Sequence, residues 1–328
     1  MMKSLIVSTA LIALFATSAP AQQLTKLRVG YDGFSMTSGP LIYGDKQGIF
    51  KRFGLDVAPI YIDGGSVLTQ AVVGGSVDIA QNGYTPALSA AVQGADVVIV
   101  GGISNRLPFQ LVVKTAITNA AELKGQAIAI SRYGSSTDTA ADFALAHLKL
   151  TRNDVKVLQL GGAATRIAAA MTGQIAGTME QYPDTAELAR HGFHVLVDVT
   201  DIAGDYPNTS YATSRAFLRS KPEVVKRFLM AMATAVNEYK GNPAVAIPLT
   251  QKFLEVKDSA NAKAAYEAYS KVYPDDLRPS LDGVALVLKE IAKKEPKAAA
   301  MKPEQFVDTS TLDALASEGF FKQLRAAN

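Results

Sequence analysis

The fold is decided by residues 64–102, which read GGSVLTQAVVGGSVDIAQNGYTPALSAAVQGADVVIVGG. Glycine turns in this stretch separate two helical segments from short runs of β-branched residues. We expect helices at Val67–Val73 and Ala87–Gln93, strands at Gly74–Ala80 and Val97–Val100, and a loop at Asn82–Pro86. Short helices between short apolar strands are typical of a parallel sheet built from strand–helix–strand units.

The same pattern recurs about a hundred residues later in the chain. Gly64, Gly65 and Ala71 match Gly161, Gly162 and Ala168 at an offset of 97 residues. After one inserted residue, Gly75, Tyr84 and Val97 match Gly173, Tyr182 and Val195 at an offset of 98. This spacing is too long for a solenoid and predicts two similar lobes. A ligand would then bind between them, outside the carboxyl ends of the strands.

Length and composition place the chain among ordinary globular proteins. It has 328 residues, of which 48% are hydrophobic and 19% charged, so it can form two domains with their own cores. Its net charge of +3 gives no reason to expect nucleic acid or a membrane surface as a partner.

Several kinds of chemistry find no support in the sequence. The chain has no Cys, which excludes disulfides, a thiol nucleophile and Cys-containing metal sites. Catalytic motifs such as G-x-S-x-G, H-E-x-x-H and G-x-G-x-x-G are absent. His191 and His194 flank a turn at a spacing that a metal could use, but no third ligand lies nearby in the sequence, so a solvated or capping role is preferred. We therefore expect no metal, no cofactor and no enzymatic activity.

Residues 1–21 differ from the rest of the chain. Lys3 supplies a positive start, Leu5–Phe15 is an apolar run, and Ala19-Pro20-Ala21 is a typical cleavage site. The run is too short to span a membrane, so this segment is predicted to be a cleaved signal peptide. No Cys is available to carry a lipid anchor, which favours a soluble protein of the periplasm.

The order of the remaining segments predicts how the chain is divided. We expect Leu27–Tyr31 to form the first strand, Gln110–Lys114 to cross to the second lobe, and Ala203–Thr213 to return. Helices from Pro222 onwards would pack on the first lobe. The predicted division is a signal peptide at 1–21, lobe 1 at 22–113 and 211–328, and lobe 2 at 114–210.

The order of several motifs resembles a known family. These are the signal peptide, Val29–Tyr31, Gly48–Val57, Gly75–Ala80, Leu123–Gly125 and Ser131–Ser135. Together they resemble the periplasmic solute-binding proteins of ABC importers in the nitrate/sulfonate/taurine group, which shares its type with the thiamine-pyrimidine (NMT1/THI5-like) proteins. The resemblance implies a two-lobed α/β fold of type II, in which each lobe is a mixed sheet flanked by helices, with extra C-terminal helices on lobe 1. It also implies a monomer that closes on a small molecule and delivers it to a permease in the inner membrane.

Three glycine-rich segments open predicted helices: Gly64-Gly65-Ser66, Gly134-Ser135-Ser136-Thr137 and Gly161-Gly162. A helix start exposes unpaired N–H groups, so it can hold a carboxylate, sulfonate or phosphate group. The second segment is the best candidate, because its hydroxyls follow a buried strand. Simple N-capping by Ser66 or Ser135 is the alternative. Arg132 could pair with an anionic ligand, although a solvated arginine or a salt bridge between the lobes is preferred.

Other candidate ligand contacts follow predicted strands at their carboxyl ends. They are Phe34 and Ser35, Asn82 and Tyr84, and Ser104 and Asn105. Tyr84 and Tyr182 occupy equivalent places in the repeat, so they could approach a ligand from opposite sides or pack within their own lobes. Glu180 and Gln181 complicate an anionic ligand, because a carboxylate would repel it but accept a hydrogen bond from an amine, amide or ring N–H.

The preferred hypothesis is a periplasmic receptor for a small organic solute: a sulfonate, a carboxylate or a nitrogen heterocycle. One alternative is a pyrimidine-forming enzyme of the NMT1/THI5 kind. The resemblance implies that such enzymes are intracellular and depend on a Cys-rich iron site, whereas this chain has no Cys and a predicted export signal. A second alternative is a ligand-sensing subunit of a membrane receptor, which genome context would separate from an importer.

Overall fold

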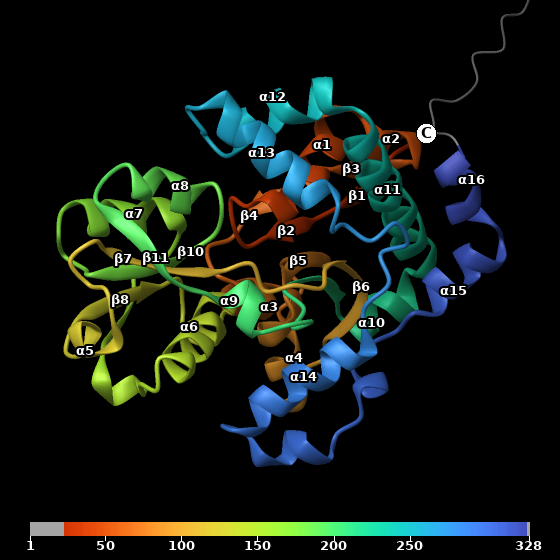
Figure 1. Ribbon diagram of the computed structural model, residues 1–328. Helices are drawn as coiled ribbons and strands as arrows, with labels where there is room; N and C mark the ends of the chain where they lie inside the picture. The colour runs from red at the N-terminus through yellow and green to blue at the C-terminus, as the bar shows by residue number, and fades with distance from the viewer. Residues whose placement is uncertain (1–22, 327–328) are drawn as a thin grey trace, which may run out of the picture.

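The computed structural model describes residues 23–326, and the predicted signal peptide lies outside these residues. The first lobe contains a five-stranded mixed sheet in the order β4-β2-β5-β12-β6 (Figure 1). Its strands are β2 (Val29–Tyr31), β4 (Ile60–Tyr61), β5 (Ile79–Gly83), β6 (Val98–Ser104) and β12 (Thr209–Thr213). Only β12 runs antiparallel to its neighbours, so the predicted parallel strand–helix–strand core is confirmed.

The second lobe contains a sheet of the same size and a related topology, in the order β11-β7-β10-β8-β9. Its strands are β7 (Gln110–Lys114), β8 (Ala127–Ile130), β9 (Lys156–Gln159), β10 (Gly177–Glu180) and β11 (Phe193–Asp198). Its helices are α5 (Ala120–Leu123), α6 (Ser136–His147), α7 (Ala163–Met171) and α8 (Asp184–Ala189). Two mixed sheets flanked by helices are the architecture that the sequence predicted.

The first crossing between the lobes differs from the prediction. Gln110–Lys114 was expected to connect the lobes, but it forms β7, which pairs with β10 and β11 inside the second sheet. Its three central residues are fully buried, as an interior strand requires. The connection therefore lies just before Gln110. The return connection ends at β12, after the short helix α9 (Val199–Ile202).

Several predicted elements are shifted or divided. The strand expected at Gly74–Ala80 lies later, as β5, because residues up to Gly83 pair with β12. Helix α4 (Tyr84–Val92) begins three residues earlier than expected, since Pro86 fits in its first turn without breaking a hydrogen bond. After β2, helices α1 (Gly39–Lys46) and α2 (Ile49–Arg52) are separated at Gly48, which has a φ of 67°.

The predicted N-terminal strand is divided. The strand expected at Leu27–Tyr31 ends and restarts around Arg28, as β1 (Thr25–Leu27) and β2. Two further short strands, β3 (Leu55–Val57) and β4, follow α2. β1 and β3 pair with each other in a small two-stranded parallel sheet beside the main one.

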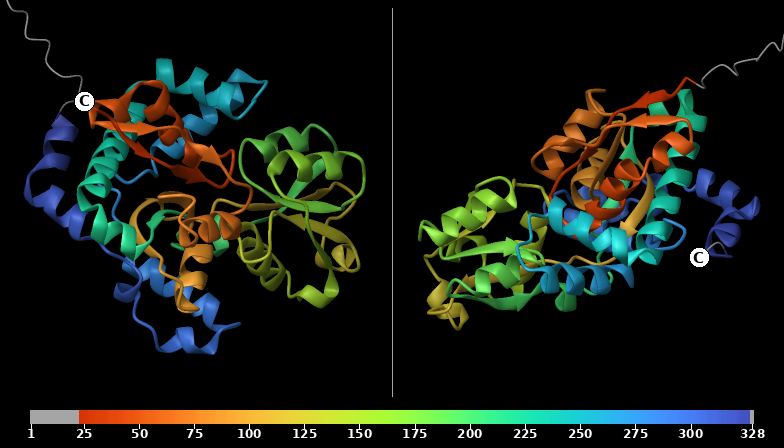
Figure 2. Two further views of the ribbon diagram at one scale, coloured as in Figure 1. Left: turned by 180° about the vertical axis from the view of Figure 1, so that it is seen from behind. Right: turned by 90° about the horizontal axis from the view of Figure 1, so that it is seen from above.

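The C-terminal helices pack on the first lobe, as predicted. They are α10 (Arg215–Ser220), α11 (Pro222–Gly241), α12 (Pro243–Phe253), α13 (Ser259–Ser270), α14 (Leu281–Ala292), α15 (Ser310–Ser317) and α16 (Phe320–Ala326). Figures 1 and 2 show them around the first sheet, with the second lobe on the other side. The longest of them, α11, packs against α1 through a core that includes Phe228, Met232 and Tyr239.

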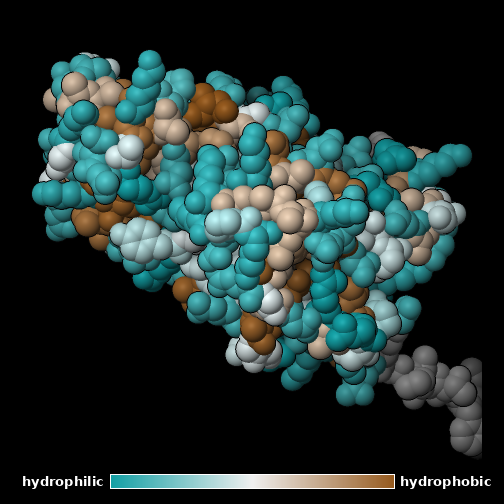
Figure 3. Space-filling view, turned by 90° about the horizontal axis from the view of Figure 1, so that it is seen from below, coloured by the Kyte–Doolittle hydropathy of each residue, from teal (hydrophilic) through white to brown (hydrophobic). Residues whose placement is uncertain are grey.

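The lobes share part of their hydrophobic core. One cluster of buried residues runs from α4 in the first lobe to α6 in the second, and these two helices contact each other. The surface seen in Figure 3 mixes hydrophobic side chains with hydrophilic ones. In the part of the chain that the structure describes, no helix combines the length and the apolar character needed to cross a membrane.

Candidate functional site

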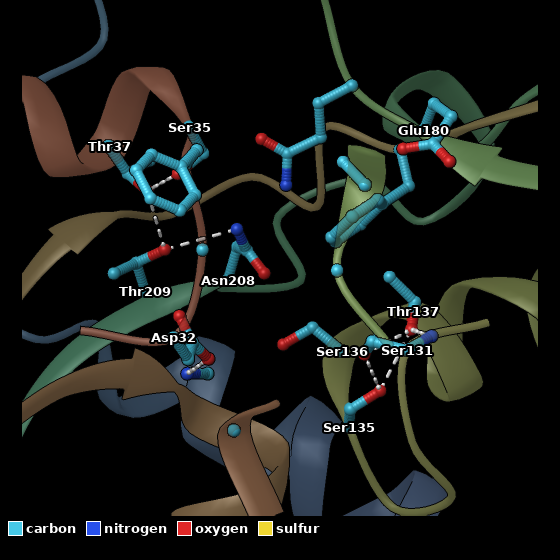
Figure 4. A pocket seen from close by; sticks show the side chains of 18 of the residues that line it. Asp32, Ser35, Thr37, Ser131, Ser135, Ser136, Thr137, Glu180, Asn208 and Thr209 are labelled. Atoms are coloured by element: carbon cyan, nitrogen blue, oxygen red, sulfur yellow. Dashed lines mark hydrogen bonds between the residues drawn. The ribbon is translucent and has the colours of Figure 1, made fainter. Parts of the chain in front are cut away.

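A cavity of about 90 Å³ lies between the two lobes. The first lobe contributes the loop after β2, the first turn of α3 (Gly65–Val73) and the end of β5. The second lobe contributes the starts of α6 and α7 and the end of β10. Figure 4 shows Asp32, Asn208 and Thr209 on one side and the serines of α6 on the other. Both lobes therefore present polar groups to the same space, as binding by lobe closure requires.

The second lobe carries a buried ion pair beside this cavity. Arg166 of α7 donates from Nε to Oε1 of Glu180 at 3.0 Å and from Nη2 to Oε2 at 2.7 Å. The two side chains are only 5% and 1% exposed. Thr178 also donates to Oε1, at 2.7 Å. Both oxygens of Glu180 are thus occupied by protein donors. A hydrogen bond from a ligand to Glu180 would add to these and stays a prediction.

The first lobe has a neutral pair at the equivalent place. At the offsets of the repeat, Thr69 corresponds to Arg166 and Asn82 to Glu180. Nδ2 of Asn82 donates to Oγ1 of Thr69 at 2.7 Å, which links helix α3 to strand β5. The same amide lies 3.4 Å from the carbonyl oxygen of Gly65. Asn82 is fully buried, so it supports the cavity wall from behind.

Asp32 presents an unpaired carboxylate from the first lobe. It follows β2, and its Oδ2 accepts a hydrogen bond from the backbone N–H of Gly83 at 3.3 Å. The same oxygen would stand 2.7 Å from a Cβ at Gly65, so it packs directly against the start of α3. Burial raises the pKa of Asp32 to about 6, although backbone hydrogen bonds oppose this. No ion pair of Asp32 is found among residues 23–326.

Asp184 presents a second unpaired carboxylate, from the first residue of α8. Burial and then the negative charge of Glu180 raise its pKa to about 7, while Arg166 opposes the shift. In the described part of the chain its carboxylate makes no hydrogen bond and no ion pair. The cavity therefore holds two carboxylates that the protein itself does not neutralise.

Hydroxyl groups line the rest of the cavity in two clusters. In the second lobe, Ser131 donates to Ser135 at 3.0 Å, and Thr137 lies 2.9 and 2.8 Å from their hydroxyls. In the first lobe, the hydroxyl of Thr37 lies 2.9 Å from that of Ser35 and 3.3 Å from that of Thr209 (Figure 4). Hydroxyls both donate and accept, so these clusters can bind either kind of ligand atom.

The structure brings nine of the sixteen predicted ligand contacts to this cavity. They are Phe34, Ser35, Gly65, Ser135, Ser136, Thr137, Glu180, Gln181 and Tyr182. Their contact with a ligand stays a prediction. A buried oxygen of Gln181, Oε1, has no hydrogen-bond partner in the described structure, so it is available to a ligand N–H.

The other seven predicted contacts lie elsewhere: Ser66, Asn82, Tyr84, Ser104, Asn105, Arg132 and Gly134. Tyr84 is fully buried in the core of the first lobe, where its hydroxyl lies beside Gly102, so it does not face Tyr182 across the cavity. Arg132 donates to Asp63 at 3.1 Å, which is the salt bridge between the lobes that the sequence analysis preferred. Gly134 donates its N–H to Asp138 and lines a different cavity.

Four charged residues near the cavity were not predicted: Asp32, Asp63, Arg166 and Asp184. At the offsets of the repeat, Arg166 corresponds to Thr69 as Glu180 corresponds to Asn82, so the repeat was a usable signal for Arg166. Asp32 directly follows the first strand, as Phe34 and Ser35 nearly do, so its position at a carboxyl end was a usable signal. Asp184 follows the end of β10 by four residues, as Ser35 follows the end of β2, so its position was a usable signal as well.

Comparisons with known proteins agree with this architecture. The family model described as NMT1/THI5 like matches residues 35–246. The taurine-binding periplasmic protein of Escherichia coli K12 is 28% identical over 200 residues, which span 60% of this chain and 61% of that protein. A solved structure from Bordetella bronchiseptica RB50 is 25% identical, with a TM-score of 0.81 over 90% of this chain and 98% of that one. The periplasmic aliphatic sulphonate binding protein of Escherichia coli has the same fold, with 22% identity and a TM-score of 0.67 over 86% of this chain and 97% of its own.

Proposed function

This chain belongs to the NMT1/THI5-like family, and on that basis we propose that it is the periplasmic solute-binding component of an ABC importer. It captures a small organic solute between its lobes and delivers it to a permease in the inner membrane. The taurine-binding relative supports a periplasmic importer component as the general role. The solute is a sulfonate, a carboxylate or a nitrogen heterocycle.

The observation that carries this proposal is the polar cavity to which both lobes contribute. A ligand that contacts both lobes binds the closed state more tightly than the open one, so it shifts the population towards closure. Ion pairs between the lobes also stabilise the closed state. Arg132 of the second lobe pairs with Asp63 of the first at 3.1 Å, and Lys294 of the C-terminal part pairs with Asp142 of α6 at 3.0 Å.

A larger space of about 610 Å³ adjoins the cavity and gives the solute room. Three aromatic residues of the first lobe line it: Phe34, Tyr61 and Phe253. The centroid of the Phe34 ring lies 4.7 Å from that of Tyr61 and 5.2 Å from that of Phe253. Aromatic faces of this kind favour an apolar or planar group. The solute therefore places its polar head in the inner cavity and its body against these rings.

The test is to screen the purified mature protein against sulfonates, carboxylates and nitrogen heterocycles by thermal shift. Small-angle scattering then measures compaction, and mass spectrometry checks the solute after incubation. We expect at least one solute to raise the melting temperature, reduce the radius of gyration and be recovered unchanged. A solute that is chemically converted, or a library in which none stabilises the protein, would contradict the proposed function.

A further inference from the structure

Side chains of the protein lie close to the helix starts around the cavity, although none of those that the structure describes caps α3 or α7 by a hydrogen bond. The carboxylate of Asp32 packs against the first residue of α3 and accepts a hydrogen bond from Gly83, the residue that precedes α4. Asp63 is equally close to the turn that begins α7, since its Oδ2 would stand 2.6 Å from a Cβ at Gly161. At α6, Ser135 accepts a hydrogen bond from the N–H of Asp138 at 3.4 Å. Carboxylates therefore stand close to the starts of α3 and α7, where an anionic ligand was expected, and they would repel it.

The charges that line the cavity leave an excess of negative charge. Four carboxylates line it, from Asp32, Asp63, Glu180 and Asp184. Glu180 is neutralised by Arg166 and Asp63 by Arg132. Asp32 and Asp184 have no cationic partner in the described part of the chain. A ligand that enters this space meets two unpaired carboxylates, and none of the described residues that line it is an unpaired cation.

Burying such carboxylates without a partner is unfavourable, and a cationic ligand would remove the cost. The raised pKa values of Asp32 and Asp184, about 6 and about 7, show that their ionised forms are poorly stabilised by the protein. A protonated nitrogen would provide the missing charge and a strong hydrogen bond to either group. A solute with only anionic groups would add to the repulsion.

We propose that the solute carries a protonated or N–H-bearing nitrogen held by Asp32 and Asp184, and that purely anionic solutes are excluded. This inference rests on the proposed function, because it assigns the ligand class of the same cavity. The hydroxyl clusters and the free oxygen of Gln181 bind the remaining polar atoms of the solute. An amine that also bears an acidic group is compatible with the site, whereas an alkanesulfonate without nitrogen is not.

The experiment uses matched probes that differ in charge but share a skeleton. The nitrogen set is ethylamine, benzylamine and 4-aminopyridine, with taurine as a zwitterion. The anionic set is ethanesulfonate, phenylmethanesulfonate and pyridine-4-sulfonate. Dissociation constants are measured at pH 8, where both carboxylates are ionised. We expect the tightest binder to come from the nitrogen set and to bind at least about tenfold more tightly than its anionic counterpart.

Two variants locate the effect within the site. Asp32→Asn and Asp184→Asn each replace a carboxylate by a neutral group of the same shape, and each should weaken the best nitrogen probe by about tenfold to a hundredfold. Asp56→Asn is the matched control, because Asp56 is exposed in β3 and should leave the affinity unchanged. If Asp32→Asn does not fold, Asp184→Asn still tests the proposal, since its side chain is only partly buried.

The outcomes separate the two proposals. Tighter binding of an anionic probe than of its nitrogen counterpart, or unchanged affinity in both variants, would overturn the inference and leave the proposed function intact. Failure of every probe in both sets to bind or to compact the protein would overturn the proposed function and the inference with it.

Discussion

The two copies of the repeated unit use the same position for different chemistry. In the first lobe, helix α3 and strand β5 are joined by the neutral pair Thr69–Asn82, at 2.7 Å. In the second lobe, helix α7 and strand β10 are joined by the ion pair Arg166–Glu180, at 2.7 Å. Each pair also bonds to its glycine turn, through the carbonyl oxygens of Gly65 and Gly161.

The difference shows that charge near the cavity is not the same as charge available to a ligand. Glu180 lies in the cavity wall, but Arg166 and Thr178 occupy both its oxygens. Asp32 has only backbone donors, and Asp184 has no hydrogen bond within residues 23–326. The ion pair thus serves as structure, and the two unpaired carboxylates serve recognition.

The largest effect is expected from breaking the ion pair. Arg166→Met leaves the carboxylate of Glu180 buried without a cationic partner, so the free energy of unfolding should fall by about 3–5 kcal/mol in chemical denaturation. The double variant Arg166→Thr/Glu180→Asn copies the pair of the first lobe into the second and should recover at least half of this loss. A loss of about 1 kcal/mol or less for Arg166→Met would show that the pair is no more important than a surface salt bridge.

A smaller effect is expected from breaking the neutral pair. Thr69→Val keeps the shape of the side chain but removes the acceptor for Asn82, so the free energy of unfolding should fall by about 1–2 kcal/mol. The control is Thr165→Val in α7, whose exposed side chain should change stability by less than about 0.5 kcal/mol. Equal losses for Thr69→Val and Arg166→Met would remove the distinction between the lobes.

The unpaired carboxylates predict that the stability of the ligand-free protein falls as the pH rises. The folded protein binds protons at Asp32 and Asp184 more tightly than the unfolded chain does, because both pKa values lie above 3.8. Their contribution to stability is full below about pH 4 and is lost as the pH rises through 6 and 7. Unfolding of the ligand-free protein from pH 4 to 8 measures it. Asp32→Asn/Asp184→Asn should flatten the profile, and an unchanged profile would contradict the assignment.

The smallest effect is expected at the pair between the lobes. Arg132 and Asp63 are 42% and 30% exposed, so Asp63→Asn should cost at most about 1 kcal/mol. Because the pair joins the two lobes, we expect a larger radius of gyration for the ligand-free variant in small-angle scattering. A stability loss above about 2 kcal/mol would contradict this prediction, because it would show that the exposed pair stabilises the fold about as much as the buried pair Arg166–Glu180 does.

The architecture could be predicted from sequence because it depends on local patterns. The repeat, the glycine turns and the apolar runs predicted two related lobes and C-terminal helices on the first one. The position of Gln110–Lys114 could not be predicted, since a short apolar run reads the same as a crossing segment or as an interior strand. Only pairing with β10 and β11 distinguishes the two.

The site was harder to predict than the fold, because its charges depend on contacts between distant residues. The sequence placed the hydroxyls of Ser135, Ser136 and Thr137 correctly at the cavity. It could not show that Arg166 neutralises Glu180, or that Tyr84 turns into the core. A sequence does not distinguish a carboxylate that is paired with a cation in the fold from one that is unpaired.

The most direct test of the account is a crystal structure of the protein with the solute that stabilises it most. The account predicts that the solute lies in the cavity between the lobes, with a nitrogen within hydrogen-bonding distance of Asp32 or Asp184 and contacts to both lobes. A solute bound to one lobe alone, or with an anionic group against these carboxylates, would contradict it.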